Sequence, residues 1–269
     1  MTGWTLRLRQ APVLRLDLRG LTPTALGALT VAEVERAPVG HGNQLLPLAE
    51  FFSVVARNDD SLVFEGDLAR CDRVGWQMDG GRLVVDGAAG DYAGACMTAG
   101  EITVWGDAGA LVACELAGGM LTIEGNVGDF AASTLPGSID GMRGGRLVVR
   151  GHAGARLADR MRRGTVVVFG DVGDFVASRL VAGTIAVGGH CGAHGGHAMR
   201  RGSVVFAGSA PEPQPTFVPA IAEVPVFWQL LARDLARHGG PFSSLPARRI
   251  ERHLGDLAAD GKGEWIVAH

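Results

Sequence analysis

The sequence predicts an all-β fold whose central part is wound as a parallel β-helix of about 19 residues per coil, with a small α+β cap before it and a helical extension after it. The first observation is a repeat. The pattern Gly-x-apolar-x-apolar-x-Gly recurs along the middle of the chain and begins at Gly81, Gly100, Gly119, Gly145, Gly164, Gly183 and Gly202. Successive repeats are 19 residues apart except for one step of 26, and such self-similarity indicates a stack of like units.

The second observation is the alternation inside each repeat. Two and four residues after the first glycine the side chain is always apolar, as in Leu83 and Val85, whereas the residue directly after that glycine, in most repeats, and much of the fifth position are polar. This period of two is typical of a strand with one buried face. A repeat of 19 residues is too short for a strand plus a crossover helix, which takes ~30 residues. We therefore expect coils stacked ~4.8 Å apart, with Val104, Ile123 and Val149 among the side chains that stack in the core.

Two further glycines recur six and nine residues after the first one. We interpret them as structural corner glycines that take positive φ in tight turns, where a Cβ would be strained. They are Gly87, Gly90, Gly106, Gly109, Gly125, Gly128, Gly151, Gly154, Gly170, Gly173, Gly189 and Gly192.

The composition is that of a globular protein with ample core material. The chain has 269 residues, 47% of them hydrophobic, and a net charge of −3, so nothing favours nucleic acid binding. No apolar run has the length of a signal peptide or of a membrane span, which predicts a cytoplasmic location and no membrane contact. The four cysteines show no metal-ligand spacing and are expected to be buried free thiols.

Three regions are predicted. Residues 1–60 form an N-terminal cap, with antiparallel strands at 5–9 and 13–18, short helices at 23–28 and 31–36, and strand-like character over 41–66. Residues 61–208 hold the β-helix repeats; the first coil is irregular, 21 residues long, and residues 137–143 form an insertion loop at a corner.

Residues 209–269 form a proline-containing linker and a helical segment. Apolar spacing predicts helices at 226–237 and 248–259, and the tail from 261 to 267 reads as a turn and a final strand. Because an open end of a stack of strands exposes core and unpaired strand edges, this segment either covers that end or reaches another subunit.

Histidines provide the candidates for chemistry. His190, His194 and His197 lie close together in sequence and are weak candidates for a metal site, but they fall on different sides of one coil, so no bound metal is expected. Asp171 is expected between His152 and His190 in an outward column, which is either a solvated charge ladder or a proton-handling site. No catalytic residue and no cofactor-binding loop can be assigned.

Two outward surfaces are candidates for partner contacts. One is a column that contains Tyr92, Phe130 and Phe175, and it is either a docking surface or a site covered by the chain's own termini. The other is basic, and either it binds an acidic partner or an anionic ligand or it is simply solvated. Its arginines recur two coils apart as Arg162, Arg163, Arg200 and Arg201.

The glycine pattern carries a family resemblance. Gly87-x-x-Gly90-x-x-x-Gly94, which returns at Gly189, resembles the C-terminal β-helix domain of glutamate synthase large subunits. Together with Leu48–Val54 and Gly255–Glu264, it is more similar to the C subunit of formylmethanofuran dehydrogenase and of its bacterial counterpart, the formyltransferase/hydrolase complex. The resemblance spans nearly the whole chain.

The resemblance implies a right-handed β-helix and a non-catalytic scaffold subunit of a hetero-oligomeric complex. Amidohydrolase-like, formyltransferase and further subunits would take the formyl group of formyl-tetrahydromethanopterin, via a methanofuran-type carrier, to formate. Any metal and the carrier would be held by those partners and not by this chain. The arginine-rich, lysine-poor composition favours the bacterial complex. The alternatives are the C subunit of an archaeal molybdenum or tungsten formylmethanofuran dehydrogenase and a stand-alone domain of the glutamate synthase type. The resemblance does not say whether the basic coils contact an acidic carrier tail.

Overall fold

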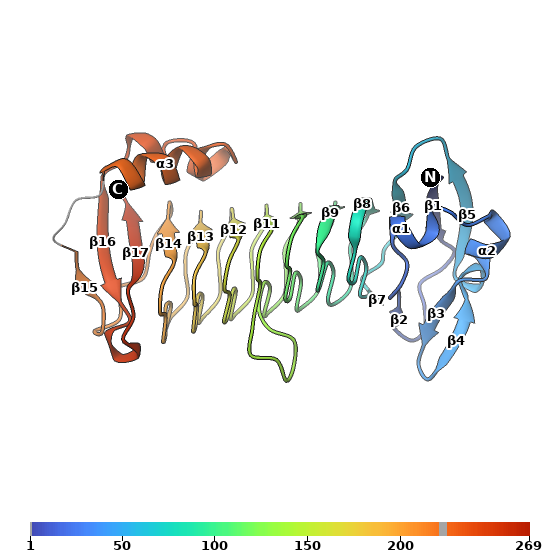
Figure 1. The fold of residues 1–269 in the computed structure, drawn as a ribbon, viewed down its shortest axis with the longest axis horizontal. Coiled ribbons are helices and arrows are strands. Elements are labelled where there is room, and N and C mark those ends of the chain that lie inside the picture. Colours follow the sequence, from blue (N-terminus) through green and yellow to red (C-terminus); the bar gives the residue numbers. More distant parts are fainter. Residues whose placement is uncertain (1, 221–224) are drawn as a thin grey trace.

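One long row of strands runs through the molecule, with a cap at each end (Figure 1). The computed structural model describes residues 2–220 and 225–269. The protein is mostly β, and its main sheet has 13 strands in the order β15-β16-β17-β14-β13-β12-β11-β10-β9-β8-β6-β1-β5. Pairing is parallel except for β1 with β5, β15 with β16 and β16 with β17 at the two ends.

Each repeat contributes one strand to the sheet, in sequence order. Equivalent residues pair, so that Val104, Ile123 and Val149 follow one another in register, each fully buried, as the alternation predicts. The first strand of the series pairs Leu62 with Leu83, which confirms the first step of 21 residues. The strands are β6 (Leu62–Glu65), β8 (Asp79–Asp86), β9 (Ala99–Val104), β10 (Met120–Ile123), β11 (Arg146–Val149), β12 (Thr165–Val168), β13 (Thr184–Val187) and β14 (Ser203–Phe206).

A second line of contacts joins the repeats away from the strands. Parallel bridges link the residues eight positions after each first glycine, from Leu68 through Ala89 to Cys191. The apolar side chains of the strands and of this line form one continuous core with those found twelve and sixteen residues after the first glycine, such as Val112 and Leu116. Burial of aliphatic side chains from every repeat therefore stabilises the whole length of the sheet.

The recurrent glycines are needed for a different reason from the one expected. Among the twelve predicted corner glycines only Gly87 has a positive φ, of 145°. At Gly109, for example, an added Cβ would collide with Asp91 Oδ1 and would lie 2.9 Å from the backbone nitrogen of Asp91 in the preceding repeat. Positive φ instead occurs at the first glycine of each repeat, such as Gly119 at 81°. The corner glycines are thus required by the close approach of neighbouring repeats.

The N-terminal cap covers the first repeat. Thr22 caps α1 (Pro23–Leu26), and Thr30 and Glu33 form the expected capping box of α2 (Val31–Glu35). The predicted pairing of the first two strands is wrong: β1 (Gly3–Leu8) pairs with β5 (Phe52–Arg57) and β6, whereas β2 (Leu16–Asp17) joins a second sheet of order β4-β3-β2-β7. Local alternation cannot distinguish between these partners. The remaining elements here are β3 (Pro38–His41), β4 (Gln44–Pro47), the 3₁₀ helix η1 (Leu48–Glu50) and β7 (Cys71–Asp72).

The C-terminal segment covers the other end of the row. β17 (Gly263–Ala268) pairs in parallel with β14, as a further repeat would, and is followed outward by β16 (Ile250–Gly255) and β15 (Val218–Pro219). α3 (Pro225–Ala236) confirms the first predicted helix, but the helix predicted at 248–259 is wrong because half of it is the strand β16 and its end is a 3₁₀ turn. Ile250 and Leu254 are four residues apart, a spacing that suits one face of a strand as well as of a helix. Three 3₁₀ helices complete the fold: η2 (Gly240–Phe242), η3 (Leu245–Ala247) and η4 (Leu257–Ala259).

All four cysteines are free thiols, and burial raises the pKa of Cys71, Cys114 and Cys191 to about 12. Cys96 is only half-buried, and its pKa is raised for the same reason. Within the described ranges, no helix is long and apolar enough to cross a membrane.

Candidate interaction surfaces

A basic groove lies beside the insertion loop, on the edge where the repeats turn. It encloses about 640 Å³, and its wall contains the four arginines that the sequence singled out. Arg162 and Arg163 come from one repeat and Arg200 and Arg201 from the repeat two steps later, while Val181 and Ala182 occupy the same positions between them. The small side chains of the middle repeat leave the space between the two arginine pairs, which are ~10 Å apart at the spacing of strands in a sheet.

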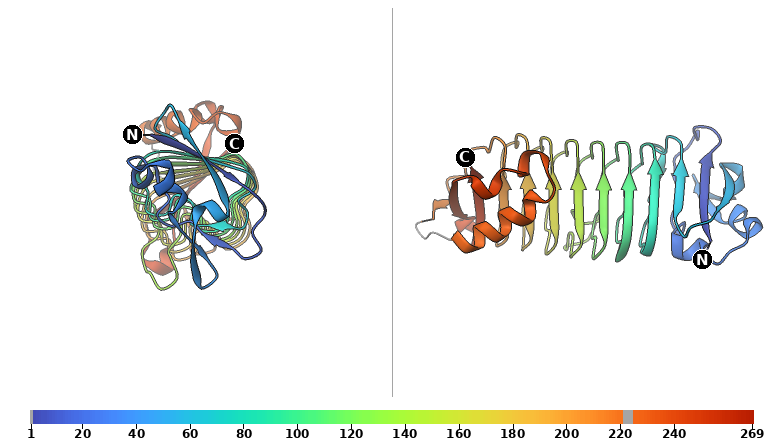
Figure 2. Two further views of the ribbon diagram at one scale, coloured as in Figure 1. Left: turned by 90° about the vertical axis from the view of Figure 1, so that its right-hand side faces the viewer. Right: turned by 90° about the horizontal axis from the view of Figure 1, so that it is seen from above.

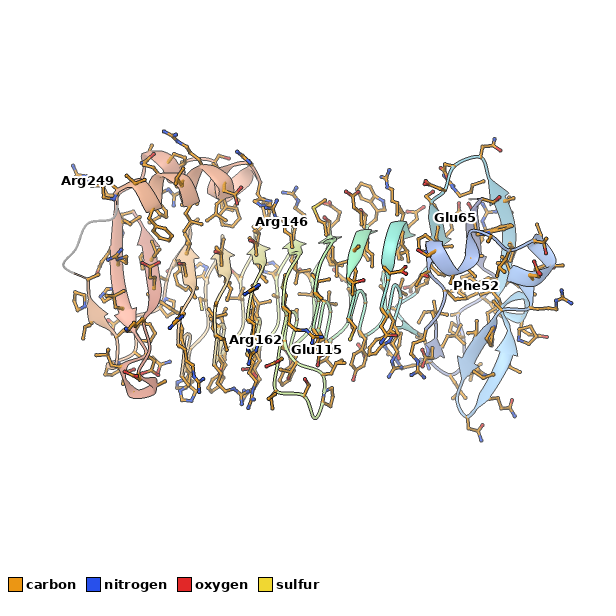
Figure 3. The ribbon with its side chains drawn as sticks, in the orientation of Figure 1. Phe52, Glu65, Glu115, Arg146, Arg162 and Arg249 are labelled. Carbon is orange, nitrogen blue, oxygen red and sulfur yellow. The ribbon has the colours of Figure 1, made fainter. Side chains whose placement is uncertain are left out.

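The charge of the groove is only partly neutralised. Arg162 Nε lies 2.5 Å from Asp140 Oδ1, and Arg143 lies 3.2 Å from Glu115 (Figure 3). Arg163, Arg200 and Arg201 are exposed and form no ion pair with any described residue. Three uncompensated guanidinium groups around one hollow attract carboxylates or phosphates, with which arginine forms bidentate contacts.

Glu115 fixes the insertion loop at the rim of this groove. Its carboxylate is almost buried, accepts a hydrogen bond from the backbone N–H of Leu135 at 3.3 Å and pairs with Arg143. Both ends of the extra segment are therefore held by one side chain from the preceding repeat. This role was not predicted from the sequence, because an isolated glutamate in a repeat carries no local signal of a contact with residues that far along the chain.

The aromatic column forms an external stack from Phe130 to His194, and Tyr92 makes a separate contact. Arg156 lies between Phe130 and Phe175, with its guanidinium carbon 5.8 and 4.8 Å from the two ring centroids. Phe175 in turn stacks on His194 at 4.9 Å, and Tyr92 contacts Arg73 at 5.0 Å. These cation–π and ring contacts stabilise the stack. Phe130 stays 38% exposed, so the described part of the chain leaves the column accessible.

The three histidines do not converge. His190 Nδ1 lies 3.4 Å from Asp171, whereas His194 and His197 both contact the ring of Phe175. A group of three or more His, Cys, Asp or Glu side chains that could hold a metal ion is not found among the residues that the structure describes.

The column of Asp171 is a ladder from side chain to backbone. Asp171 Oδ1 accepts the N–H of His190 at 2.7 Å, and His152 Nδ1 accepts the N–H of Asp171 at 2.9 Å. The hydrogen bond from His190 is the main reason why the pKa of Asp171 lies below its usual value. A second ladder, which was not predicted from the sequence, runs through Asp91, Asp129 and Asp174. Each carboxylate accepts a hydrogen bond from the backbone N–H of an alanine in the next repeat. Their alternation with alanine was the available signal. These carboxylates link repeats, as side-chain oxygens do in turns.

Comparisons with known proteins give a consistent set of relatives. A chain in the crystal structure of the formyltransferase/hydrolase complex (FhcABCD) from Methylorubrum extorquens, in complex with methylofuran, superposes with a TM-score of 0.93 and 41% sequence identity over 98% of this chain and 99% of that one. The C subunit of the formyltransferase/hydrolase complex Fhc of the same organism is 43% identical over 86 residues. The C subunit of the tungsten-containing formylmethanofuran dehydrogenase 2 of Methanothermobacter thermautotrophicus is 30% identical over 92 residues. These two alignments span about a third of each curated relative, 32% and 34%. No family model matches the sequence.

Proposed function

The chain belongs to the family of C subunits of formyltransferase/hydrolase complexes, and from this membership we propose that it is a non-catalytic scaffold subunit of such a complex. The observation that carries the proposal is the near-complete superposition, at 41% identity, on a chain of an assembled complex. In that role the chain works in the cytoplasm beside amidohydrolase-like, formyltransferase and further subunits. These partners pass the formyl group of formyl-tetrahydromethanopterin, via a methanofuran-type carrier, to formate and hold any metal that the reaction uses.

We also propose that the repeats form a right-handed parallel β-helix over residues 61–208, between the cap of residues 1–60 and the extension of residues 209–269. The in-register parallel strands, the second line of bridges and the core that runs through all the repeats support this winding. The right hand is supported by the strong preference of parallel crossover connections. A rigid rod of this kind presents long, fixed surfaces on which several partners can be positioned.

The alternative role is that of the C subunit of a formylmethanofuran dehydrogenase. It is supported by the 30% identity to the tungsten enzyme, but the chain of the formyltransferase/hydrolase complex is more similar and is matched over almost its whole length. We therefore assign the bacterial type of complex.

The scaffold role is tested by purification under gentle conditions. Affinity capture of the tagged chain from its host cells, followed by mass spectrometry, should recover the larger sister subunits in fixed proportion, and the purified chain alone should have no formyl-transfer or hydrolase activity. Recovery of a lone 28.0 kDa species, or activity in the isolated chain, would exclude the role.

The basic groove is proposed as the contact for an acidic segment of one of these partners. Reversal of charge in Arg200→Glu should reduce co-purification of that partner by about tenfold or more, because a guanidinium contact is replaced by repulsion. Arg249→Glu changes an exposed arginine that does not line the groove and lies at the end of the molecule, away from Arg162 (Figure 3), and is the matched control. Equal loss in both variants would show that only overall charge matters.

A further inference from the structure

The outward face of the large sheet is covered over only part of its length. α3, η2 and η3 lie over β12, β13, β14 and β17, and their contacts form a second hydrophobic core (Figure 2). Under that cover the outward residues Val167, Ala186 and Val205 are fully buried. On β8, the outward residue Val84 occupies the same register position but remains partly exposed, because no described segment covers it.

This uncovered face, on β8, β9 and β10, has Val84, Thr103 and Thr122 along its middle row, with large apolar side chains on either side of that row. Trp105, which directly follows β9, is 59% exposed, and Met120 on β10 is 37% exposed. Large apolar side chains gathered on one surface mark an interface. Asp86, Glu101 and Glu124 lie beside them and form no ion pair with another described residue; the exposed Arg82 is the basic side chain beside Glu101, so the face is acidic on balance. Next to Trp105 the surface is hollowed by a depression of about 460 Å³, with Val84 and Asp86 in its wall.

The outer face of α3 has the opposite charge. Val226, Phe227 and Leu230 are 71%, 40% and 64% exposed, and their spacing of one and four residues places them on the same side of the helix. Further along lie the exposed Arg233 and Arg237, of which Arg237 pairs with Asp234 at 3.6 Å. α3 therefore buries one face against its own sheet and shows a second apolar face, with arginines beside it, to its surroundings.

We propose that these two surfaces bind each other in a symmetric dimer of this chain, so that α3 of one copy packs on the uncovered face of β8, β9 and β10 of the other. A helix is ~10 Å thick, so the part of the molecule covered by α3 stands higher than the bare sheet beside it. The surface therefore has a step between the end of the uncovered face and α3. Two such stepped surfaces related by a two-fold axis interlock, and both contacts form at once. This is the self-complementarity that an isologous interface requires. The large apolar side chains of the two surfaces meet, and the arginines of α3 face the acidic side chains of the sheet.

The proposal does not depend on the scaffold role, and it is tested on the isolated full-length chain by sedimentation velocity with light scattering. The 28.0 kDa chain should sediment as a dimer at micromolar concentration. Leu230→Glu and Trp105→Glu should each weaken the dimer by about 30-fold or more, because each places a carboxylate in the desolvated centre of the interface. Leu257→Glu changes an exposed leucine of η4, outside both surfaces, and should leave the dimer intact. All three side chains are exposed, so melting temperatures should stay close to that of the wild type.

Cross-linking tests the pairing of the two surfaces. A mixture of Leu230→Cys and Trp105→Cys chains under mild oxidation should give a covalent dimer, whereas either variant alone should give little. A wild-type chain that remains monomeric up to about 100 µM would overturn the proposal. So would a dimer insensitive to both glutamate substitutions, or a cross-link formed by Leu230→Cys alone, which would place α3 against α3. If Leu230→Glu left the dimer intact but removed a sister subunit from the purified complex, the face of α3 would belong to that subunit and the proposal would also fall.

Discussion

Replacement of Gly128 by alanine tests the packing between repeats most directly. An added Cβ would lie 2.9 Å from the backbone nitrogen of Ala110 and 3.0 Å from the carbonyl carbon of Gly109, both in the preceding repeat. The Gly128 N–H also donates to Gly109 O at 2.9 Å, so the two repeats cannot separate without loss of this hydrogen bond. Overpacking of this kind costs ~1–3 kcal/mol, and a weakened backbone hydrogen bond adds ~1 kcal/mol.

The sum, ~2–4 kcal/mol, is a large part of the stability of an ordinary domain. For a chain of this size it corresponds to a melting temperature lower by roughly 5–15 °C, measured by circular dichroism on the purified protein. Gly80→Ala is the matched control, because its added Cβ would have only Thr24 Oγ1 near it, at 3.9 Å. If Gly128→Ala melted within about 2 °C of this control, close approach of the repeats would not be the reason for the regular spacing of glycine along the chain.

Three further predictions concern single side chains. Glu115→Gln should lower stability by ~1 kcal/mol and speed tryptic cleavage in the insertion loop, since the ion pair that holds the loop is lost; Glu212→Gln, at an exposed position in the linker, should do neither. The pKa of Asp171 is lowered in the folded protein, first by the hydrogen bond from the backbone N–H of His190. The charged carboxylate therefore adds stability above roughly pH 4, and this stability is lost as the pH falls through the lower folded-state pKa. Between pH 5 and pH 3 the melting temperature of Asp171→Asn should fall less than that of the wild type. Burial raises the pKa of Cys114 to about 12, so Ellman's reagent at pH 8 should label it only after unfolding in urea, and labelling of the native chain at this position would contradict the buried assignment.

Some elements were predictable because their signals are local or periodic. The capping residues of α1 and α2 lie within three positions of the helix starts, and the structure confirms both helices. The alternation in each repeat indicates which side chains face inward, and stacking of equal repeats then sets the register. Arg162, Arg163, Arg200 and Arg201 were likewise brought to one surface by the repeat itself, because residues a whole number of repeats apart share a position.

Other elements depended on contacts between distant segments. The alternation in β1 is typical of any strand with one buried face, and only the fold pairs β1 with β5 and β6. Ile250 and Leu254 suit a helix or a strand equally, and the free edge of β17 decides for the strand. The salt bridge of Glu115 with Arg143 joins residues of different repeats across an insertion that breaks the period.

The sequence by itself determined the repeat, its strands, its buried positions and its basic edge. Each of these follows from a short sequence period, because residues a whole number of repeats apart take equivalent positions when the repeats stack. Only the tertiary structure decided which segments cover the ends of the row, where α3 lies on the sheet and which half of the sheet stays open. Those outcomes depend on burial between segments far apart in the chain. The residues that make such contacts show no periodic sequence pattern from which the contacts could be predicted.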